Sequence, residues 1–114
     1  MQYEVFLHEE AEKFILSVPL KMQAKIQRCI NLLEEFGNDL REPHSKKIVG
    51  EKSLFELRVK IGTDISRLFY FHLKEKKFVI TSGFLKKTDK TDKNEILKAT
   101  KLMIRIKEED NVQS

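Results

Sequence analysis

Residues 55–85 read FELRVKIGTDISRLFYFHLKEKKFVITSGFL, and their apolar residues recur with the period of extended strands. A first strand is predicted where apolar residues alternate with charged ones, at Phe55, Leu57 and Val59. Residues 61–64 predict a hairpin loop, and residues 73–77 predict a second turn. The apolar runs 65–72 and 78–85 supply two further strands, so we expect an antiparallel meander.

The chain before this stretch carries a short strand and then a helical period. Alternation at the start, at Tyr3, Val5 and Leu7, predicts the strand. Two helices are predicted next, the first ending near Pro19 and the second running from Pro19 to a glycine cap at Gly37. Their apolar stripes consist of Ala11, Phe14, Ile15 and Val18, and of Met22, Ile26, Cys29, Ile30, Leu33 and Phe36. We expect the helices to form a hairpin with a shared apolar face.

The segments on either side of the meander complete the predicted fold. Ile48–Val49 predicts a short strand before a turn at residues 50–53. Asp92 and Glu95 form a capping-box pattern at the start of a last helix. Its inward stripe is Ile96, Ala99, Met103 and Ile106. The predicted order is β-α-α-β-β-β-β-α, an α+β fold in which the helical hairpin packs on one face of a twisted, mainly antiparallel sheet. We expect residues 1–107 to form a single domain and residues 108–114 a polar tail.

Composition indicates a folded domain with an excess of positive charge. The chain has 114 residues, 40% of them hydrophobic, and a net charge of +4. Such a charge is compatible with a polyanionic partner. Its one cysteine, Cys29, excludes an intrachain disulfide and fits a reducing compartment; we expect it to be a buried thiol. There is no apolar run of the roughly 20 residues that a membrane span needs, and no signal-peptide pattern. We therefore expect a cytoplasmic protein with no membrane partner.

The usual signatures of metal and cofactor sites are absent from the sequence. It contains no glycine-rich phosphate loop, no H-E-x-x-H pattern and no Cys/His cluster with the spacing of a zinc site. The three histidines, His8, His44 and His72, are far apart in sequence. We expect neither a metal nor a cofactor.

Cations gather on the predicted sheet instead. Arg58 and Lys60 are two residues apart, so they share the strand face opposite to the apolar residues. Arg67 follows across the hairpin, within an apolar run where its bare burial would be very costly. Two interpretations remain open for Arg67. It forms an ion pair with Glu56 or Asp64, or it converges with the other cations on a phosphate.

Three stretches together resemble a known family. Residues 54–58 read LFELR, residues 67–70 read RLFY, and residues 83–91 read GFLKKTDKT. They resemble the L-[WFY]-E-L-R, R-x-x-Y and G-F-x-K-K-T-x-K-T motifs of the phage-derived HigB-like branch of the RelE/ParE toxin superfamily, in the same order. The resemblance covers nearly the whole chain. Two positions depart from it: Ser82 stands where many relatives carry His, and Asp92 where many carry Pro. The first departure removes a candidate acid/base, and the second leaves a good helix cap.

The resemblance implies a fold, an activity and partners. RelE-like toxins cleave mRNA, often in the ribosomal A site, and are neutralised by a co-expressed antitoxin in a hetero-oligomer. By this likeness the catalytic candidates are Arg58, Lys60, Arg67 and Lys87. The candidates for RNA binding are Lys86, Lys90, Lys46 and Lys47. The alternative for the lysines after the last strand is a solvated charged loop.

The implied chemistry needs few groups. A ribose 2′-OH attacks the adjacent phosphate while arginines stabilise the developing charge. Lys60 is the candidate base, since like charges beside it favour its neutral form. Lys86 or Lys87 is the candidate to protonate the leaving oxygen. The alternative is a non-catalytic binding module of the same fold, such as a ParE-like gyrase inhibitor or an adaptor. The last helix either contacts the antitoxin or completes the core.

Overall fold

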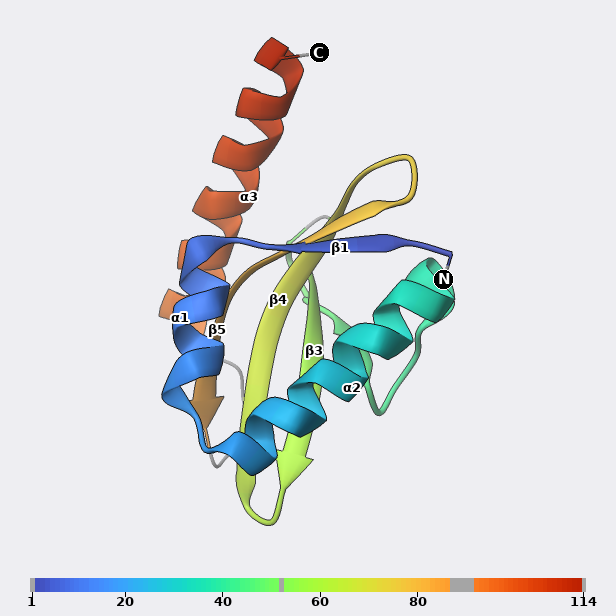
Figure 1. Cartoon of the computed structure of the whole chain (residues 1–114). Coiled ribbons are helices and arrows are strands. Elements are labelled where there is room, and N and C mark those ends of the chain that lie inside the picture. Colours follow the sequence, from blue (N-terminus) through green and yellow to red (C-terminus); the bar gives the residue numbers. More distant parts are fainter. Residues whose placement is uncertain (1, 52, 87–91, 114) are drawn as a thin grey trace.

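The computed structural model describes residues 2–51, 53–86 and 92–113 (Figure 1). Its elements follow the predicted order β-α-α-β-β-β-β-α, which confirms the α+β fold. They are β1 (Glu4–Leu7), α1 (Glu9–Ser17), α2 (Leu20–Phe36), the short 3-10 helix η1 (Gly37–Asp39), β2 (Ser45–Lys47), β3 (Phe55–Ile61), β4 (Asp64–Lys74), β5 (Lys77–Lys86) and α3 (Lys93–Gln113). Among the described residues, no helix combines the length and the apolar character that crossing a membrane requires.

A five-stranded sheet in the order β1-β5-β4-β3-β2 forms the centre of the fold. The strands β2 to β5 pair in antiparallel fashion, as predicted, and β1 pairs with β5 in parallel. The β3–β4 hairpin turns at Gly62, where a φ of 59° suits a residue without a Cβ. Ile61 pairs with Asp64 at this turn, and the register that follows places Arg58 directly opposite Arg67.

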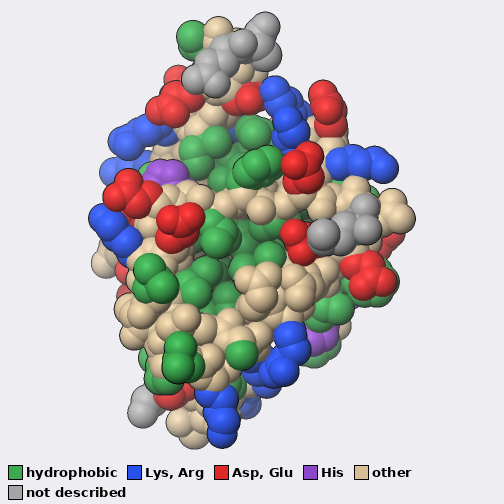
Figure 2. Space-filling model, in the orientation of Figure 1, with side chains coloured by type: hydrophobic (Ala, Val, Ile, Leu, Met, Phe, Trp, Pro, Cys, Tyr) green, Lys and Arg blue, Asp and Glu red, His purple; other side chains and the backbone are tan. Residues whose placement is uncertain are grey.

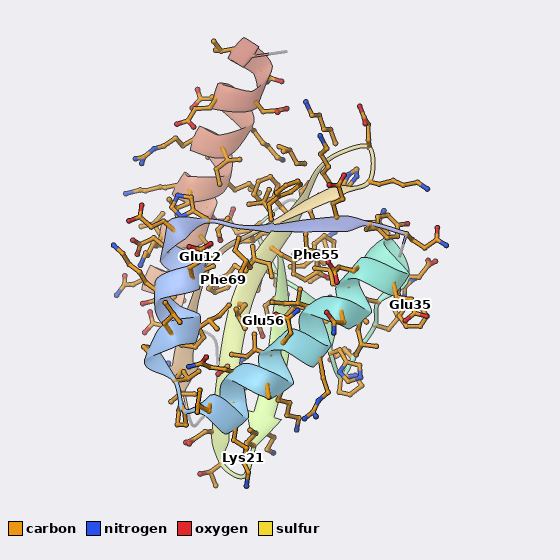
Figure 3. The ribbon with its side chains drawn as sticks, in the orientation of Figure 1. Glu12, Lys21, Glu35, Phe55, Glu56 and Phe69 are labelled. Carbon is orange, nitrogen blue, oxygen red and sulfur yellow. The ribbon has the colours of Figure 1, made fainter. Side chains whose placement is uncertain are left out.

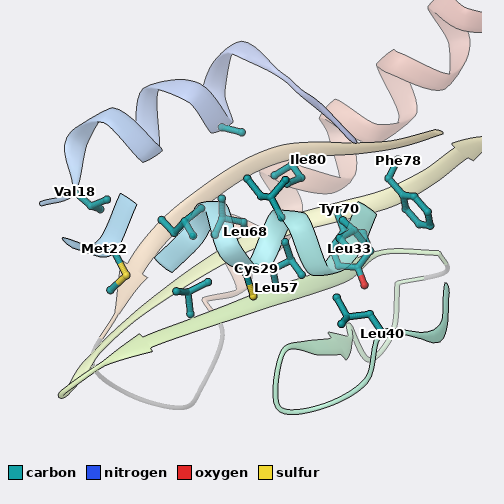
Figure 4. Close-up of a cluster of buried hydrophobic side chains, with 14 residues drawn as sticks. Val18, Met22, Cys29, Leu33, Leu40, Leu57, Leu68, Tyr70, Phe78 and Ile80 are labelled. Carbon is teal, nitrogen blue, oxygen red and sulfur yellow. The ribbon is translucent and has the colours of Figure 1, made fainter. Parts of the chain in front are cut away.

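The helices α1 and α2 cover one face of the sheet, in front of it in Figure 1. Their stripes pack against sheet residues that include Leu57, Leu68 and Ile80 in one buried cluster (Figure 4). The packing is close where α1 meets β5: a Cβ on Gly83 would come within 2.6 Å of Cδ2 of Phe14. This glycine therefore lets the helix approach the strand.

The helix α3 packs on the opposite face of the sheet. Successive residues of β4 point to opposite sides, so Leu68 joins the cluster under α1 and α2 while Phe69 joins a second cluster under α3. The predicted stripe of α3 is confirmed, with Ala99 and Met103 buried and Ile96 and Ile106 partly buried against that cluster. The helix therefore completes a second core, as one of the two interpretations expected.

Two boundaries differ from the prediction. The strand before the meander is β2, Ser45–Lys47, and not Ile48–Val49. Ile48 instead packs in the cluster under α3, and its amide donates to the carbonyl of Leu54. An outer strand with two exposed lysines carries no apolar alternation, because it has little to bury. The last helix also continues to Gln113, so residues 108–113 extend α3 and form no separate tail.

Candidate functional site

The pairing of β2, β3, β4 and β5 aligns the cations in rows across the sheet. Residues that lie directly opposite each other on paired strands share a face. Arg58 lies opposite Arg67, and Lys60 lies opposite Ile65, which in turn lies opposite Lys86. Lys46 lies opposite Glu56 on the other side of β3. We call the four lysine and arginine residues of these rows that are not buried, Lys46, Arg58, Lys60 and Lys86, the cationic face.

A buried carboxylate sits between the two arginines. Oε1 of Glu56 lies 2.9 Å from Nη1 of Arg67 and 3.4 Å from Nε of Arg58. Figure 3 shows Glu56 near the middle of the sheet. Two guanidinium groups placed directly opposite each other repel, and a shared carboxylate offsets that repulsion. Glu56 thereby fixes where both arginines lie.

The three partners differ sharply in exposure. The side chains of Arg67 and Glu56 are 0% and 1% exposed, whereas that of Arg58 is 21% exposed. The expectation of an open cluster that includes Arg67 is thus not met: its guanidinium is enclosed. The alternative interpretation, an ion pair with Glu56, is confirmed. Arg58 and the exposed Lys60 remain accessible to a ligand.

The other predicted cations lie at the margins or outside the described residues. Lys86 ends β5, and its Nζ lies 4.0 Å from Oδ2 of Asp92. Lys46 and Lys47 are exposed on β2. Lys87 and Lys90, which were predicted to be catalytic and RNA-binding respectively, fall outside the part of the chain that the structure describes.

Two other reactive side chains, those of Cys29 and Tyr70, are buried in the core. Burial raises the pKa of the Cys29 thiol to about 11, so the thiol is protonated at neutral pH. Burial likewise raises the pKa of Tyr70, whose hydroxyl is hydrogen-bonded to that of Ser45. Ser82, at the position where the resembling family often carries His, is 1% exposed. Over the described residues no three His, Cys, Asp or Glu side chains form a group that could hold a metal ion.

Sequence reasoning missed a groove beside the cationic face. A cavity of about 490 Å³ lies between α2 and the part of β3 that extends beyond β2. Lys25 and Arg28 of α2 line it together with His44, and Arg58 and Lys60 border it from β3. Exposed lysines and arginines on a helix are ordinary in sequence, so nothing marked Lys25 and Arg28 before the fold placed them beside β3.

Comparisons with known proteins identify the family and the fold of this chain. Residues 13–104 match the model of the family described as "Phage derived protein Gp49-like (DUF891)". The chain belongs to this Gp49-like family. That match spans the second half of α1, all of α2, the meander and the first part of α3, up to residue 104. The comparison with curated proteins found no match.

Solved structures show which fold this Gp49-like chain has. It is similar to a chain of the archaeal RelE–RelB complex from Pyrococcus horikoshii OT3, at 23% identity over 80% of this chain and 100% of that chain, with a TM-score of 0.54. It is also similar to a chain of the intact E. coli RelBE toxin–antitoxin complex, at 18% identity over 77% of this chain and 99% of that chain, with a TM-score of 0.55. At such identities the likeness establishes a RelE-like fold.

Proposed function

We propose that this protein is the toxin of a type II toxin–antitoxin pair, of the HigB-like kind, and that it cleaves mRNA in the cytoplasm without a metal. The observation that carries the proposal is the group formed by Arg58, Glu56 and Arg67 beside the exposed Lys60. A phosphodiester on the cationic face can contact the accessible guanidinium of Arg58. The buried ion pair of Glu56 with Arg67 fixes the position of that guanidinium. The RelE-like fold and the family membership support the same function.

The residues divide the reaction among them. Arg58 contacts the non-bridging oxygens of the scissile phosphate and stabilises the charge that develops when the 2′-OH attacks. Lys60, two residues along the same strand face, accepts the proton of that hydroxyl. Lys86, across β4 from Lys60, contacts the RNA backbone or protonates the leaving 5′ oxygen. Arg67 acts through Glu56 and Arg58, as a positioning residue, because its own side chain is enclosed.

The partners in the proposal are a cognate antitoxin, the mRNA and the ribosome. Both similar structures are complexes, one of RelE with RelB and one of the RelBE toxin–antitoxin pair, which supports an antitoxin for this chain. The cationic face supports an acidic partner protein as well as RNA, because either relieves the mutual repulsion of its like charges. Bound antitoxin would exclude RNA from the same face.

Primer extension on mRNA from cells that express the protein tests the proposal. Discrete new 5′ ends are expected with the wild type and not with Arg58→Ala produced at the same level. Parallel measurement of plasmid supercoiling tests the gyrase-inhibitor alternative. Loss of supercoiling without discrete 5′ ends would overturn the ribonuclease assignment and favour a ParE-like activity.

A further inference from the structure

The groove beside α2 lies on the other side of β3 from the Glu56 group, because Val59 packs under α2 while the flanking Arg58 and Lys60 point to the opposite face of the sheet. Its floor includes Cys29 and Leu32 from α2 and Val59 from β3, all apolar or weakly polar. Four cationic residues line the groove, Lys25 and Arg28 from α2 and Arg58 and Lys60 from the edge of β3. Among the described residues that line it, none is acidic. An apolar floor within a cationic rim suits a ligand that has a flat apolar body and negative charge.

The size and position of the groove further restrict which ligands it can hold. A volume of about 490 Å³ is that of a site for one small molecule or one nucleotide, not for a whole helix. Blue side chains in Figure 2 mark lysine and arginine along the lower part of the molecule, where α2 crosses the β3–β4 hairpin. Arg58 and Lys60 line the groove from the edge of β3 that extends beyond β2, so an RNA strand on the cationic face enters the groove by passing around this edge.

A competing occupant would be an extended segment of a partner protein that pairs with the free edge of β3. The structure argues against this occupant at Lys60. The ammonium group of Lys25 donates to the backbone carbonyl of Lys60, so this edge acceptor is already satisfied within the chain. An added strand would have to break that bond before pairing there. A nucleotide needs no edge carbonyl, and its phosphate can bind Lys25 and Arg28 while the bond remains.

We infer that the groove between α2 and β3 holds one nucleotide of the RNA, adjacent to the scissile phosphate. The base rests on the floor at Leu32 and Val59, and the phosphate of that nucleotide lies against Lys25 and Arg28. Stacking and apolar contact with a base are tolerant of sequence, while His44 at the groove provides a ring that can stack or hydrogen-bond. This inference rests on the proposed function and assigns a binding subsite to it.

Fluorescence anisotropy with a six-nucleotide 2′-O-methyl RNA tests the subsite, since this RNA lacks the hydroxyl that the cleavage step requires. Arg28→Glu changes an exposed residue, so the fold should persist. Binding is expected to weaken about tenfold, and the slope of log K against log salt to fall by about 0.7, because one phosphate contact is lost. Leu32→Trp fills the groove. Binding is expected to weaken about tenfold with an unchanged salt slope, because the variant blocks the space for the base but removes no charge.

Lys76→Glu provides the matched control. Lys76 is exposed in the β4–β5 turn, at the end of β4 opposite to the β3–β4 hairpin, and a change below twofold is expected there. Circular dichroism melts measure whether each variant folds. If Leu32→Trp does not fold, Arg28→Glu alone still tests the subsite. A wild type that binds no RNA would overturn the subsite, whereas the proposed function is decided separately by the primer-extension experiment in cells. RNA binding that both groove variants leave intact would overturn only the subsite, and selective loss of antitoxin binding would assign the groove to that protein instead.

Discussion

Oε1 of Glu56 lies 2.9 Å from Nη1 of Arg67, and the two side chains are 1% and 0% exposed. This buried pair lies beneath the row of cations that the sheet presents, and Arg58 contacts the same carboxylate oxygen at 3.4 Å. The two arginines look equivalent in the sequence, but their different burial gives them different roles. Arg67 supplies a fixed positive charge inside the fold, while Arg58 carries the accessible guanidinium.

Glu56→Ala should destabilise the protein by about 3–5 kcal/mol, because it leaves the charge of Arg67 buried without this carboxylate. Replacing both partners by apolar residues of similar size, Glu56→Leu with Arg67→Met, should cost far less, since no buried charge remains. Urea unfolding monitored by circular dichroism measures both. Equal losses for the single and the double variant would show that the pair is not what holds this part of the sheet.

Arg58→Ala should relieve growth arrest while the protein stays folded. Its side chain is 21% exposed and Glu56 keeps Arg67 as a partner, so Arg58→Ala should cost less stability than Glu56→Ala. Arg67→Ala should also relieve the arrest, but through loss of the folded state. Growth curves paired with thermal melts distinguish the two causes. Full toxicity from a folded Arg58→Ala protein would remove Arg58 from the site.

The meander could be predicted because strands that bury at least one face leave their period in the sequence. The apolar alternation at Phe55, Leu57 and Val59 and the glycine at Gly62 gave the β3–β4 hairpin, and with it the pairing of Arg58 with Arg67. β2 could not be predicted in the same way. Its Lys46 and Lys47 are exposed at the outer edge of the sheet, so no burial constrains their type.

The residues of the site could be predicted from the sequence, but the burial of each side chain could not. Spacing alone shows that Arg58 and Lys60 share a face, and it raises Glu56 as a partner for Arg67 without deciding for it. The enclosure of Arg67 depends on packing around the sheet, which no local pattern records. Lys25 and Arg28 became part of a groove only when α2 crossed the end of β3, a contact between segments more than thirty residues apart.

Gly83→Ala should destabilise the protein by about 1–3 kcal/mol, the usual cost of overpacking a close contact. A Cβ at Gly83 would lie 2.6 Å from Cδ2 of Phe14 and 3.0 Å from the backbone oxygen of Arg67, so either α1 or the strand must shift. Combining the change with Phe14→Leu should restore part of the loss, because the helix side of the contact is then smaller. Chemical denaturation of the single and double variants measures this, and additive losses would contradict the contact.

The thiol of Cys29 should react slowly with iodoacetamide at pH 7 in the folded protein. Burial raises its pKa from 9.0 to about 11, which lowers the reactive thiolate fraction about a hundredfold. The stability that this raised pKa contributes is complete below pH 9 and is lost as the pH rises towards 11, since the unfolded chain releases the proton first. Rates in the presence and absence of denaturant, between pH 7 and pH 10, test this. Equal rates in the two states would show that the thiol is accessible.

The proposed antitoxin should associate with this protein at a rate that falls steeply as salt rises. The cationic face concentrates Lys46, Arg58, Lys60 and Lys86, and such a field attracts an acidic partner over roughly the Debye length, about 10 Å at 0.1 M salt. Apolar contacts should provide most of the affinity, so the dissociation rate should change little with salt. Stopped-flow mixing with the product of the adjacent gene, at low and high salt, measures both rates. Charge reversal by Lys60→Glu should slow association, whereas Lys76→Glu, at the other end of the sheet, should leave it nearly unchanged. An association rate that is indifferent to salt, and to Lys60→Glu, would show that the partner recognises another surface.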